Sequence, residues 1–133
     1  MSRIISFSEA ASIGLHTMIL VAQSKNELIN VNTIADRTGT SRHHVAKVAQ
    51  RLVKSGMLSS SRGPSGGFVL KSKPEKVSFL DIYEAIEGNI DNPKCPSNNP
   101  VCPFDKCIMN NVVNKLTNEF RKYLESQILS SYI

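Results

Sequence analysis

Apolar residues fill nearly every helical face between Phe7 and about Ser24, which is typical of a helix buried on most sides. Ser6 or Ser8 can cap its start, since a serine side chain accepts a hydrogen bond from a backbone N–H of the first turn. We expect His16 to lie in the core with its neighbours. The pattern therefore predicts a buried helix that other elements cover.

Two shorter helices are predicted next, at residues 31–38 and from Ser41 to about residue 55. Gly39 can end the first, because glycine adopts the left-handed conformation at little cost, and Ser41 can cap the second. A DNA-binding helix-turn-helix needs a small residue where its helices cross, a turn that tolerates positive φ, and apolar residues that pack helix on helix. The chain supplies these features at Ala35, Gly39, Val45 and Val48, with Ile34 beside the alanine. A generic helical hairpin is the alternative.

Residues 57–72 change to a pattern of short strands. The run Gly63-Pro64-Ser65-Gly66-Gly67 predicts a tight tip and Phe68-Val69-Leu70 a returning strand, so the segment forms a β-hairpin wing. Glycine-rich loops can also hold nucleotide phosphates, but those loops open a helix, whereas this one joins two strands. The pattern therefore favours the wing.

The last part of the chain combines helix and loop. A helix is predicted over residues 79–87, stopped by Gly88, and residues 89–103 form a loop that holds four of the six prolines. From Phe104 to about Ser130 we expect one long helix, with Pro103 as its first residue. An apolar side chain recurs every four residues along it, which predicts a stripe suited to dimerisation: Ile108, Val112, Leu116, Phe120, Leu124 and Ile128.

These elements predict a mainly α fold with a small β-hairpin wing, namely a winged helix-turn-helix followed by a long C-terminal helix. We assign residues 1–75 to the winged helix-turn-helix region and residues 76–133 to a cysteine-loop and dimerisation-helix region. A chain of 133 residues suits one compact domain, so we expect both regions to share it.

The charge of the chain changes sign close to the boundary between these two regions. The formal net charge is +5, but residues 1–73 carry ten Lys and Arg against three Asp and Glu, a balance of +7, and residues 74–133 carry six against eight, a balance of −2. A basic first half suits a polyanionic partner, so we expect the helix-turn-helix and wing to bind double-stranded DNA. For any single lysine, a solvated surface position is the alternative.

The residues expected at the DNA lie on the second helix of the motif and on the wing. Steps of about 100° per residue turn the apolar side chains from Val45 to Leu52 inward and the basic and hydrogen-bonding side chains outward. Arg62 precedes a slender tip that can carry a guanidinium into a narrow minor groove. The candidate DNA-binding residues are Ser41, Arg42, His43, Lys47, Gln50, Arg51, Lys54, Arg62 and Ser65.

Three cysteines, Cys95, Cys102 and Cys107, lie close together in the sequence. An odd number cannot pair fully within the chain, and thiolates gathered in one loop are typical ligands of zinc or of an iron–sulfur cluster. Three thiolates leave a further ligand to be supplied from elsewhere. We expect Cys107 in the first turn of the long helix, where the helix dipole would stabilise an anionic cluster. Zinc and iron are alternative metals at this point.

The whole chain closely resembles the Rrf2-type family of bacterial winged-helix transcription regulators. The resemblance rests on the helix-turn-helix, on the three cysteines before a long helix, and on the wing motif Arg62-Gly63-Pro64-Ser65-Gly66-Gly67-Phe68. It implies a homodimer with crossed long helices and an iron–sulfur cluster, of 2Fe–2S or 4Fe–4S type, on Cys95, Cys102 and Cys107. The cysteine spacing departs from the one common in the family.

Members of this family complete the cluster with a histidine three positions after the last cysteine, or with an acidic residue at the start of the first helix of the partner subunit. Asn110 occupies the first position here, whereas Phe7-Ser8-Glu9 matches the second pattern. The resemblance therefore implies Glu9 as the fourth ligand, with Asp105 or a small-molecule thiol as alternatives. Glu9 could instead serve only the dipole of its own helix.

The sequence shows no paired carboxylates, Cys/His dyad or Ser/His/Asp set placed for catalysis, so we predict a regulator and not an enzyme. We expect a cytoplasmic repressor or activator, controlled by an iron–sulfur cluster that senses nitric oxide, redox state, iron or cluster status. Its operator should have approximate two-fold symmetry, to match two winged helices. The alternative is a regulator of the same fold whose cysteines hold structural zinc or sense thiol oxidation.

Overall fold

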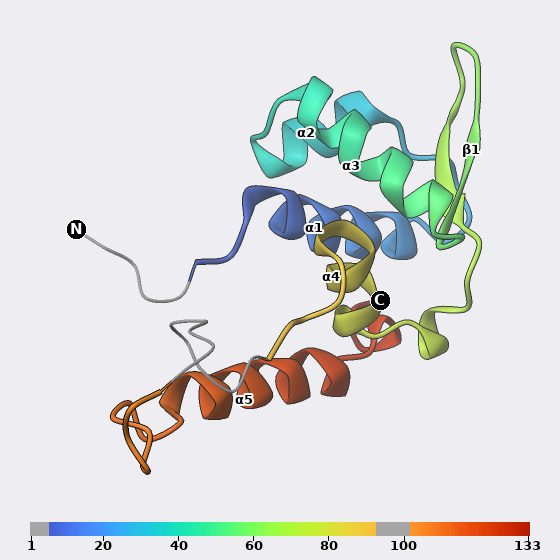
Figure 1. Cartoon of the computed structure of the whole chain (residues 1–133). Helices are drawn as coiled ribbons and strands as arrows, with labels where there is room; N and C mark the ends of the chain where they lie inside the picture. The colour runs from blue at the N-terminus through green and yellow to red at the C-terminus, as the bar shows by residue number, and fades with distance from the viewer. Residues whose placement is uncertain (1–5, 93–101) are drawn as a thin grey trace.

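Helix α1 (Glu9–Gln23) lies at the centre of the fold, between the helix-turn-helix and the C-terminal elements (Figure 1). The structure is a computed structural model that describes residues 6–92 and 102–133. α1 packs on α3 (Arg42–Lys54) and on α4 (Phe79–Glu87). Gly14 permits the close approach to α4, because a Cβ atom there would lie 3.0 Å from Cγ1 of Ile86. The predicted buried helix is confirmed.

Ser8 caps α1 as the pattern predicts: its Oγ accepts a hydrogen bond from the N–H of Ala11 at 3.0 Å. The expectation for His16 is wrong, because its imidazole is exposed and its Nδ1 lies 2.7 Å from the carbonyl oxygen of Ser12. Thr17 takes a buried position instead, and its Oγ1 has no hydrogen-bond partner among the described residues. The face of α1 that carries His16 is therefore open to solvent.

Helices α2 (Val31–Thr38) and α3 form the predicted helix-turn-helix. Gly39 ends α2 with φ at 68°, in the left-handed region that favours glycine, and the Oγ of Ser41 accepts from the N–H of His44 at 3.1 Å. The apolar residues predicted to pack the motif are buried, namely Ile34, Ala35, Val45, Val48, Ala49 and Leu52. Both the bounds and the inner face of the motif are confirmed.

The wing is an antiparallel hairpin that projects beyond the helices (Figure 1). Strand β1 (Leu58–Ser61) pairs along its length with β2 (Gly67–Leu70). Two further hydrogen bonds tie β2 to the residue two positions before α2: the N–H of Phe68 donates to the carbonyl of Ile29 at 2.9 Å, and the N–H of Ile29 donates back at 3.2 Å. Gly67 allows this contact, since a Cβ atom there would lie 2.6 Å from the carbonyl oxygen of Ile29.

The C-terminal elements close the fold against α1. A short 3-10 helix, η1 (Pro74–Lys76), leads into α4, which begins with a capping box between Ser78 and Asp81. A second 3-10 helix, η2 (Leu129–Tyr132), returns to the start of α4, where the N–H of Leu129 donates to the carbonyl of Val77 at 2.8 Å. The described helices include none long and apolar enough to cross a membrane.

Helix α5 (Val112–Ser126) is shorter than predicted. It does not begin near Phe104, because the backbone turns at Asn110 and Asn111, where φ is 51° and 53°. Asparagine tolerates this left-handed conformation better than most residues do, and a residue in this conformation interrupts an α-helix. Pro103 and Cys107 therefore lie before α5, so the prediction that Cys107 occupies the first turn of the helix is wrong.

The apolar stripe predicted for the long helix is divided between different environments. Leu124 is buried and Phe120 is half-buried, whereas Val112 and Leu116 are 40% and 39% exposed. Ile108 lies in the turn before α5 and Ile128 lies beyond its end, in a bridge to the start of α4. The part of the stripe on α5 nearest the cysteines is thus open to solvent in the single chain.

Candidate nucleic-acid interface and cysteine segment

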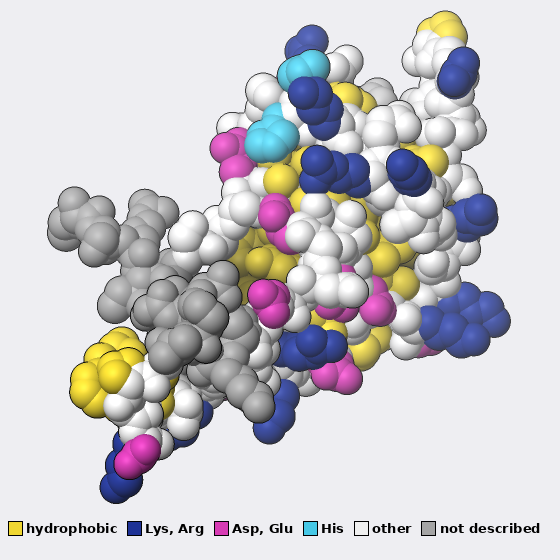
Figure 2. Space-filling view, viewed as in Figure 1, with side chains coloured by type: hydrophobic (Ala, Val, Ile, Leu, Met, Phe, Trp, Pro, Cys, Tyr) yellow, Lys and Arg dark blue, Asp and Glu magenta, His cyan; other side chains and the backbone are white. Residues whose placement is uncertain are grey.

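Basic side chains gather at the end of the molecule formed by the helix-turn-helix and the wing. Figure 2 shows Lys, Arg and His side chains over this end and near the wing tip, while most acidic side chains in this view lie closer to the C-terminal elements. The structure leaves all the candidate DNA-binding residues exposed: Ser41, Arg42, His43, Lys47, Gln50, Arg51, Lys54, Arg62 and Ser65. The charge asymmetry of the sequence therefore corresponds to a feature of the surface.

A groove of about 390 Å³ lies between the wing and the helix-turn-helix. Gln50 of α3 lines it from one side and Arg62 of the wing from the other, so the structure brings these two candidates to one concave surface. Asn30 and Asn32, at the start of α2, line it as well and were missed by the sequence analysis. Their position at the first turn of the helix-turn-helix was the signal that could have indicated them.

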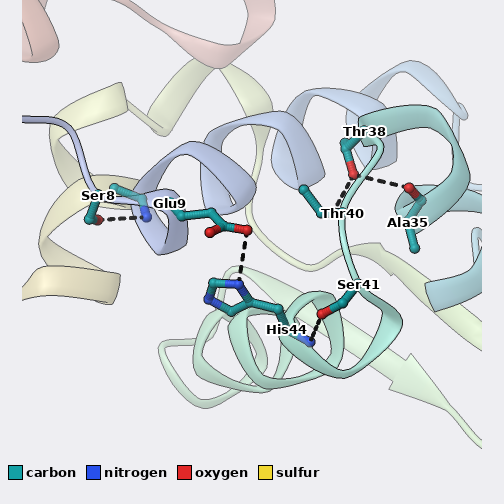
Figure 3. A network of polar contacts seen from close by, with 8 residues as sticks. Ser8, Glu9, Ala35, Thr38, Thr40, Ser41 and His44 are labelled. Atoms are coloured by element: carbon teal, nitrogen blue, oxygen red, sulfur yellow. Dashed lines mark hydrogen bonds and ion pairs between the residues drawn. The ribbon is translucent and has the colours of Figure 1, made fainter.

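Glu9 and His44 connect the start of α1 with the first turns of α3. Figure 3 shows the carboxylate of Glu9 pointing to the imidazole ring, and Oε1 lies 3.3 Å from Nδ1 of His44. The side chain of Glu9 is 66% exposed, so this contact leaves most of the carboxylate accessible. A residue singled out as a metal ligand thus has a contact with the helix expected at DNA.

Arg51 connects the far part of α3 with the end of α4. Its Nη1 donates to the carbonyl oxygen of Ile86 at 2.8 Å. One residue further along, Glu87 accepts a hydrogen bond from the Oγ of Ser8 at 2.6 Å. Polar contacts therefore connect α3 to the start of α1, through His44 and Glu9, and to the end of α4, through Arg51. No local sequence pattern indicated them.

An aromatic cluster lies beside this junction. The ring of Tyr83 lies 5.7 Å from that of Phe7 and 5.7 Å from that of Phe120, so residues from before α1, from α4 and from α5 meet. Burial, and then the charge of Glu87, raise the pKa of Tyr83 above its ordinary value. The phenol is therefore neutral at physiological pH and suits an apolar contact between α4 and α5.

The cysteine segment is only partly described. Cys102 is exposed and Cys107 half-buried, both as free thiols, whereas Cys95 lies outside the described residues. In the parts of the chain that the structure describes, no three His, Cys, Asp or Glu side chains gather to hold a metal ion. Thiols are donors of the kind that iron–sulfur clusters accept. The described residues thus supply two of the three predicted cysteine ligands, and the third, Cys95, is not among them.

A buried central helix, a helix-turn-helix and a β-hairpin that flanks it define a winged helix-turn-helix protein, the fold class predicted from the sequence. The sequence model of the Rrf2 family, described as an iron-dependent transcriptional regulator, matches residues 7–133. The chain therefore belongs to the Rrf2 family.

Two relatives and one solved structure illustrate the similarity. The HTH-type regulator BadM of Rhodopseudomonas palustris is 34% identical over 74 residues, which cover 56% of this chain and 47% of BadM. The HTH-type regulator NsrR of Bacillus licheniformis is 27% identical over 118 residues, 87% of this chain and 82% of NsrR. The structure of CymR (YrzC), the global cysteine regulator of B. subtilis, gives a TM-score of 0.76 at 25% identity, covering 98% of this chain and 99% of CymR.

The chain thus spans about half the length of BadM and most of the length of NsrR and CymR. These relatives are transcriptional regulators and not enzymes, in agreement with the prediction from the sequence.

Proposed function

We propose that this protein regulates transcription as a homodimer that binds double-stranded DNA and whose DNA affinity is set by an iron–sulfur cluster on its cysteines. The observation that carries the DNA-binding part is the groove between α3 and the wing, where Gln50 and Arg62 face the same space. Membership of a family of transcriptional regulators supports it independently. Such a protein would act in the cytoplasm.

On DNA, α3 would enter the major groove and the wing an adjacent minor groove. The outward side chains of α3 would approach base edges, with His43, Lys47 and Gln50 as hydrogen-bonding partners. Residues at the two ends of α3 and at the wing tip would lie closer to the phosphates and the minor groove, namely Ser41, Arg42, Lys54, Arg62 and Ser65. Base contacts would supply specificity and phosphate contacts would fix the position of the protein.

A second copy of this chain would cover the exposed stripe of α5. Val112 and Leu116 are about two-fifths exposed, at 40% and 39%, and they follow one another on the same face of the helix. Burial of such apolar side chains is the main favourable contribution to association. A dimer with two winged helices would then favour an operator of approximate two-fold symmetry.

Cys95, Cys102 and Cys107 would hold the cluster, of 2Fe–2S or 4Fe–4S type, and Glu9 of the partner subunit would complete its ligand set. Thiolate ligands suit iron–sulfur clusters, and the family is described as iron-dependent. When bound, the cluster would supply a redox-active, oxygen- and nitric-oxide-sensitive centre. The accessible carboxylate of Glu9 is a weak, exchangeable donor, which suits a sensor. The signal could be nitric oxide, redox state, iron or cluster status.

A second candidate function uses the same cysteines without iron. The exposed thiol of Cys102 favours thiol oxidation as the regulating chemistry, and thiolates are also ligands of structural zinc. DNA binding and dimerisation would be the same in both cases.

Anaerobic purification followed by visible absorption and iron and sulfide analysis separates the two candidates. We expect a coloured protein whose operator affinity changes when the cluster is lost, because zinc and free thiols are colourless. Single replacements Cys95→Ala, Cys102→Ala and Cys107→Ala should each remove most of the colour. A colourless protein with one zinc per chain, or full iron and sulfide in any of these variants, would contradict the cluster assignment.

The role of Glu9 has its own test. Glu9→Gln keeps the shape of the side chain and removes its charge, so we expect a changed cluster spectrum and faster loss of the cluster in air. Asp105→Asn is the matched control at the other acidic candidate near the cysteines. A wild-type spectrum and oxygen stability in Glu9→Gln would assign the fourth ligand elsewhere.

A further inference from the structure

Arg51 lies on the basic side of α3, yet its guanidinium is already engaged within the protein. The donor is Nη1, the acceptor is the carbonyl oxygen of Ile86, and the two are 2.8 Å apart. Ile86 lies in the last turn of α4, where carbonyl groups lack a partner within the helix. A cation at this end also interacts favourably with the helix dipole. Arg51 therefore acts as a C-terminal cap of a different helix.

We infer that Arg51 is a positioning residue, which holds α3 at a fixed angle against the end of α4 and does not itself contact DNA. This inference rests on the proposed DNA binding and assigns one of its candidate residues a different role. A side chain that leaves the end of α4 to reach a phosphate would give up a hydrogen bond and a helix cap. Lys54, three residues further along α3, is exposed and free of that cost.

The contact of Arg51 belongs to a set that fixes α3 from both ends. Near its start, Nδ1 of His44 lies 3.3 Å from the Glu9 carboxylate. Glu9 follows Ser8, and the Oγ of Ser8 donates to Glu87 at 2.6 Å, next in sequence to the residue that Arg51 contacts. Both ends of α3 are thus connected to one junction, between the start of α1 and the end of α4.

The same junction leads toward the cysteines. After α4 the N–H of Ile90 donates to the Glu84 carboxylate at 3.2 Å, and Asn92 contacts α5: its Nδ2 donates to Oδ1 of Asn118 at 2.9 Å and its Oδ1 accepts from Nδ2 of Asn114 at 3.3 Å. Residue 93 begins the part of the cysteine segment that lies outside the described residues. The residues after α4 are thus tied to α4 and to α5, and Arg51 is the side chain that connects the end of α4 to α3.

A positioning residue and a phosphate contact differ in how they affect the salt dependence of DNA binding. Each phosphate contact contributes about −0.9 to the slope of log affinity against log salt concentration, so two Arg51 contacts in a dimer would contribute about −1.8. A positioning residue contributes nothing to this slope. Its loss lowers affinity for the operator but leaves affinity for unrelated DNA unchanged, because only the specific complex needs the correct angle of α3.

The test is Arg51→Met, which keeps the aliphatic stem and removes the donors and the charge. We expect operator affinity to fall by about tenfold, the factor associated with a hydrogen bond to a charged group, with unrelated DNA bound as by wild type and the salt slope unchanged. Arg42→Met, at the other end of α3, is the matched control and should make the slope less steep. A slope less steep by about 1.8 in Arg51→Met, or unchanged operator affinity, would overturn the inference.

A second variant keeps the inference testable if Arg51→Met does not fold, and a hydrogen-exchange measurement tests it without DNA. If Arg51→Met does not fold, Arg51→Gln keeps an amide donor for the Ile86 carbonyl while it removes the charge, and the salt slope gives the same decision. The N–H of Gly88 donates to the carbonyl of Glu84 at 2.9 Å, and its hydrogen exchange without DNA should be faster in Arg51→Met, since the end of α4 loses its cap. Wild-type protein that binds operator and unrelated DNA equally would refute the proposed function, whereas unchanged exchange of Gly88 in Arg51→Met would refute the role of Arg51.

Discussion

The part of the chain from α1 to α4 and the helix α5 differ in how completely a single chain buries them. Residues from α1 to α4 supply nearly the whole core, including Met18, Ile34, Val45, Leu52 and Ile82, which are at most 1% exposed. Most large apolar side chains that stay exposed in the described residues follow residue 101: Phe104, Ile108, Met109, Val112, Leu116, Tyr123 and Ile133.

The helix ends differ in the same way. Each of the helices α1 to α4 is preceded by a residue whose side chain accepts a hydrogen bond from the first turn, whereas Asn111, which precedes α5, provides no such cap. Local sequence therefore stabilises the first region in several independent ways. The second region has fewer local determinants and more exposed apolar side chains, so we expect its arrangement to depend more on what packs against it.

The largest effect is expected in the core of the first region. Leu52→Ala should lower the free energy of unfolding by about 2–5 kcal/mol, because Leu52 is fully buried and a cavity would remain. Urea denaturation at several protein concentrations measures this loss, which should not depend on concentration. Leu28→Ala is the control, since Leu28 is 44% exposed, and should cost less than about 1 kcal/mol. Equal losses in both variants would show that the first region has no core of its own.

Dimerisation should respond to a charge on the exposed stripe of α5. We expect Leu116→Glu to raise the dimer dissociation constant by about 100-fold, since the carboxylate would have to be desolvated at the interface. Sedimentation velocity measures this shift, and far-UV circular dichroism should stay unchanged. Lys122→Glu, about 120° around the helix from Leu116, is the control and should dimerise as wild type. An intact dimer in Leu116→Glu would move the interface elsewhere.

DNA binding should respond to the wing. We expect Arg62→Ala to weaken operator binding by about 1–3 kcal/mol at fixed salt, since the guanidinium would leave the minor groove. Gel-shift titration measures the change, with Lys76→Ala in η1 as the control outside the proposed interface. If both variants bind the operator as wild type does, the wing does not contact DNA in the proposed way.

The smallest effect is expected at Thr17. Its Oγ1 is buried without a hydrogen-bond partner among the described residues, so Thr17→Val should raise the free energy of unfolding by up to about 1 kcal/mol. Thermal unfolding measures the gain as a higher Tm, and Thr33→Val on the exposed surface of α2 is the control. A loss of more than about 1 kcal/mol in Thr17→Val would indicate that the hydroxyl makes a buried hydrogen bond.

Sequence reasoning was most successful where the determinant is local. Gly39 and Ser41 predicted the turn of the helix-turn-helix because each acts on its own backbone, and the wing followed from its glycines and proline. The start of α5 was missed because the apolar period continues through Ile108 although the backbone turns at Asn110. Periodicity reports which side chains are apolar, not where a helix begins.

The partners of the polar residues on α3 were harder to predict. Arg51 and Ile86 are 35 residues apart, and so are Glu9 and His44, so no pattern within one helix indicates either contact. Helical spacing placed Arg51 on the outer side of α3 with Lys47 and Lys54, and its exposure agrees with that placement. The hydrogen bond to α4 depends on where two helices cross, which only the tertiary structure provides.

The paired hydrogen bonds between Ile29 and Phe68 tie the base of the wing to the segment before α2 and so restrict how the wing can move against the helix-turn-helix. We therefore expect the spacing between the wing and α3 to change little when the protein binds a duplex. The energy of fitting would then fall on the DNA, whose groove width and stiffness vary with sequence. Base pairs that no side chain touches would then affect affinity through how readily they narrow or bend. Operators of this regulator should share a shape as well as a set of bases.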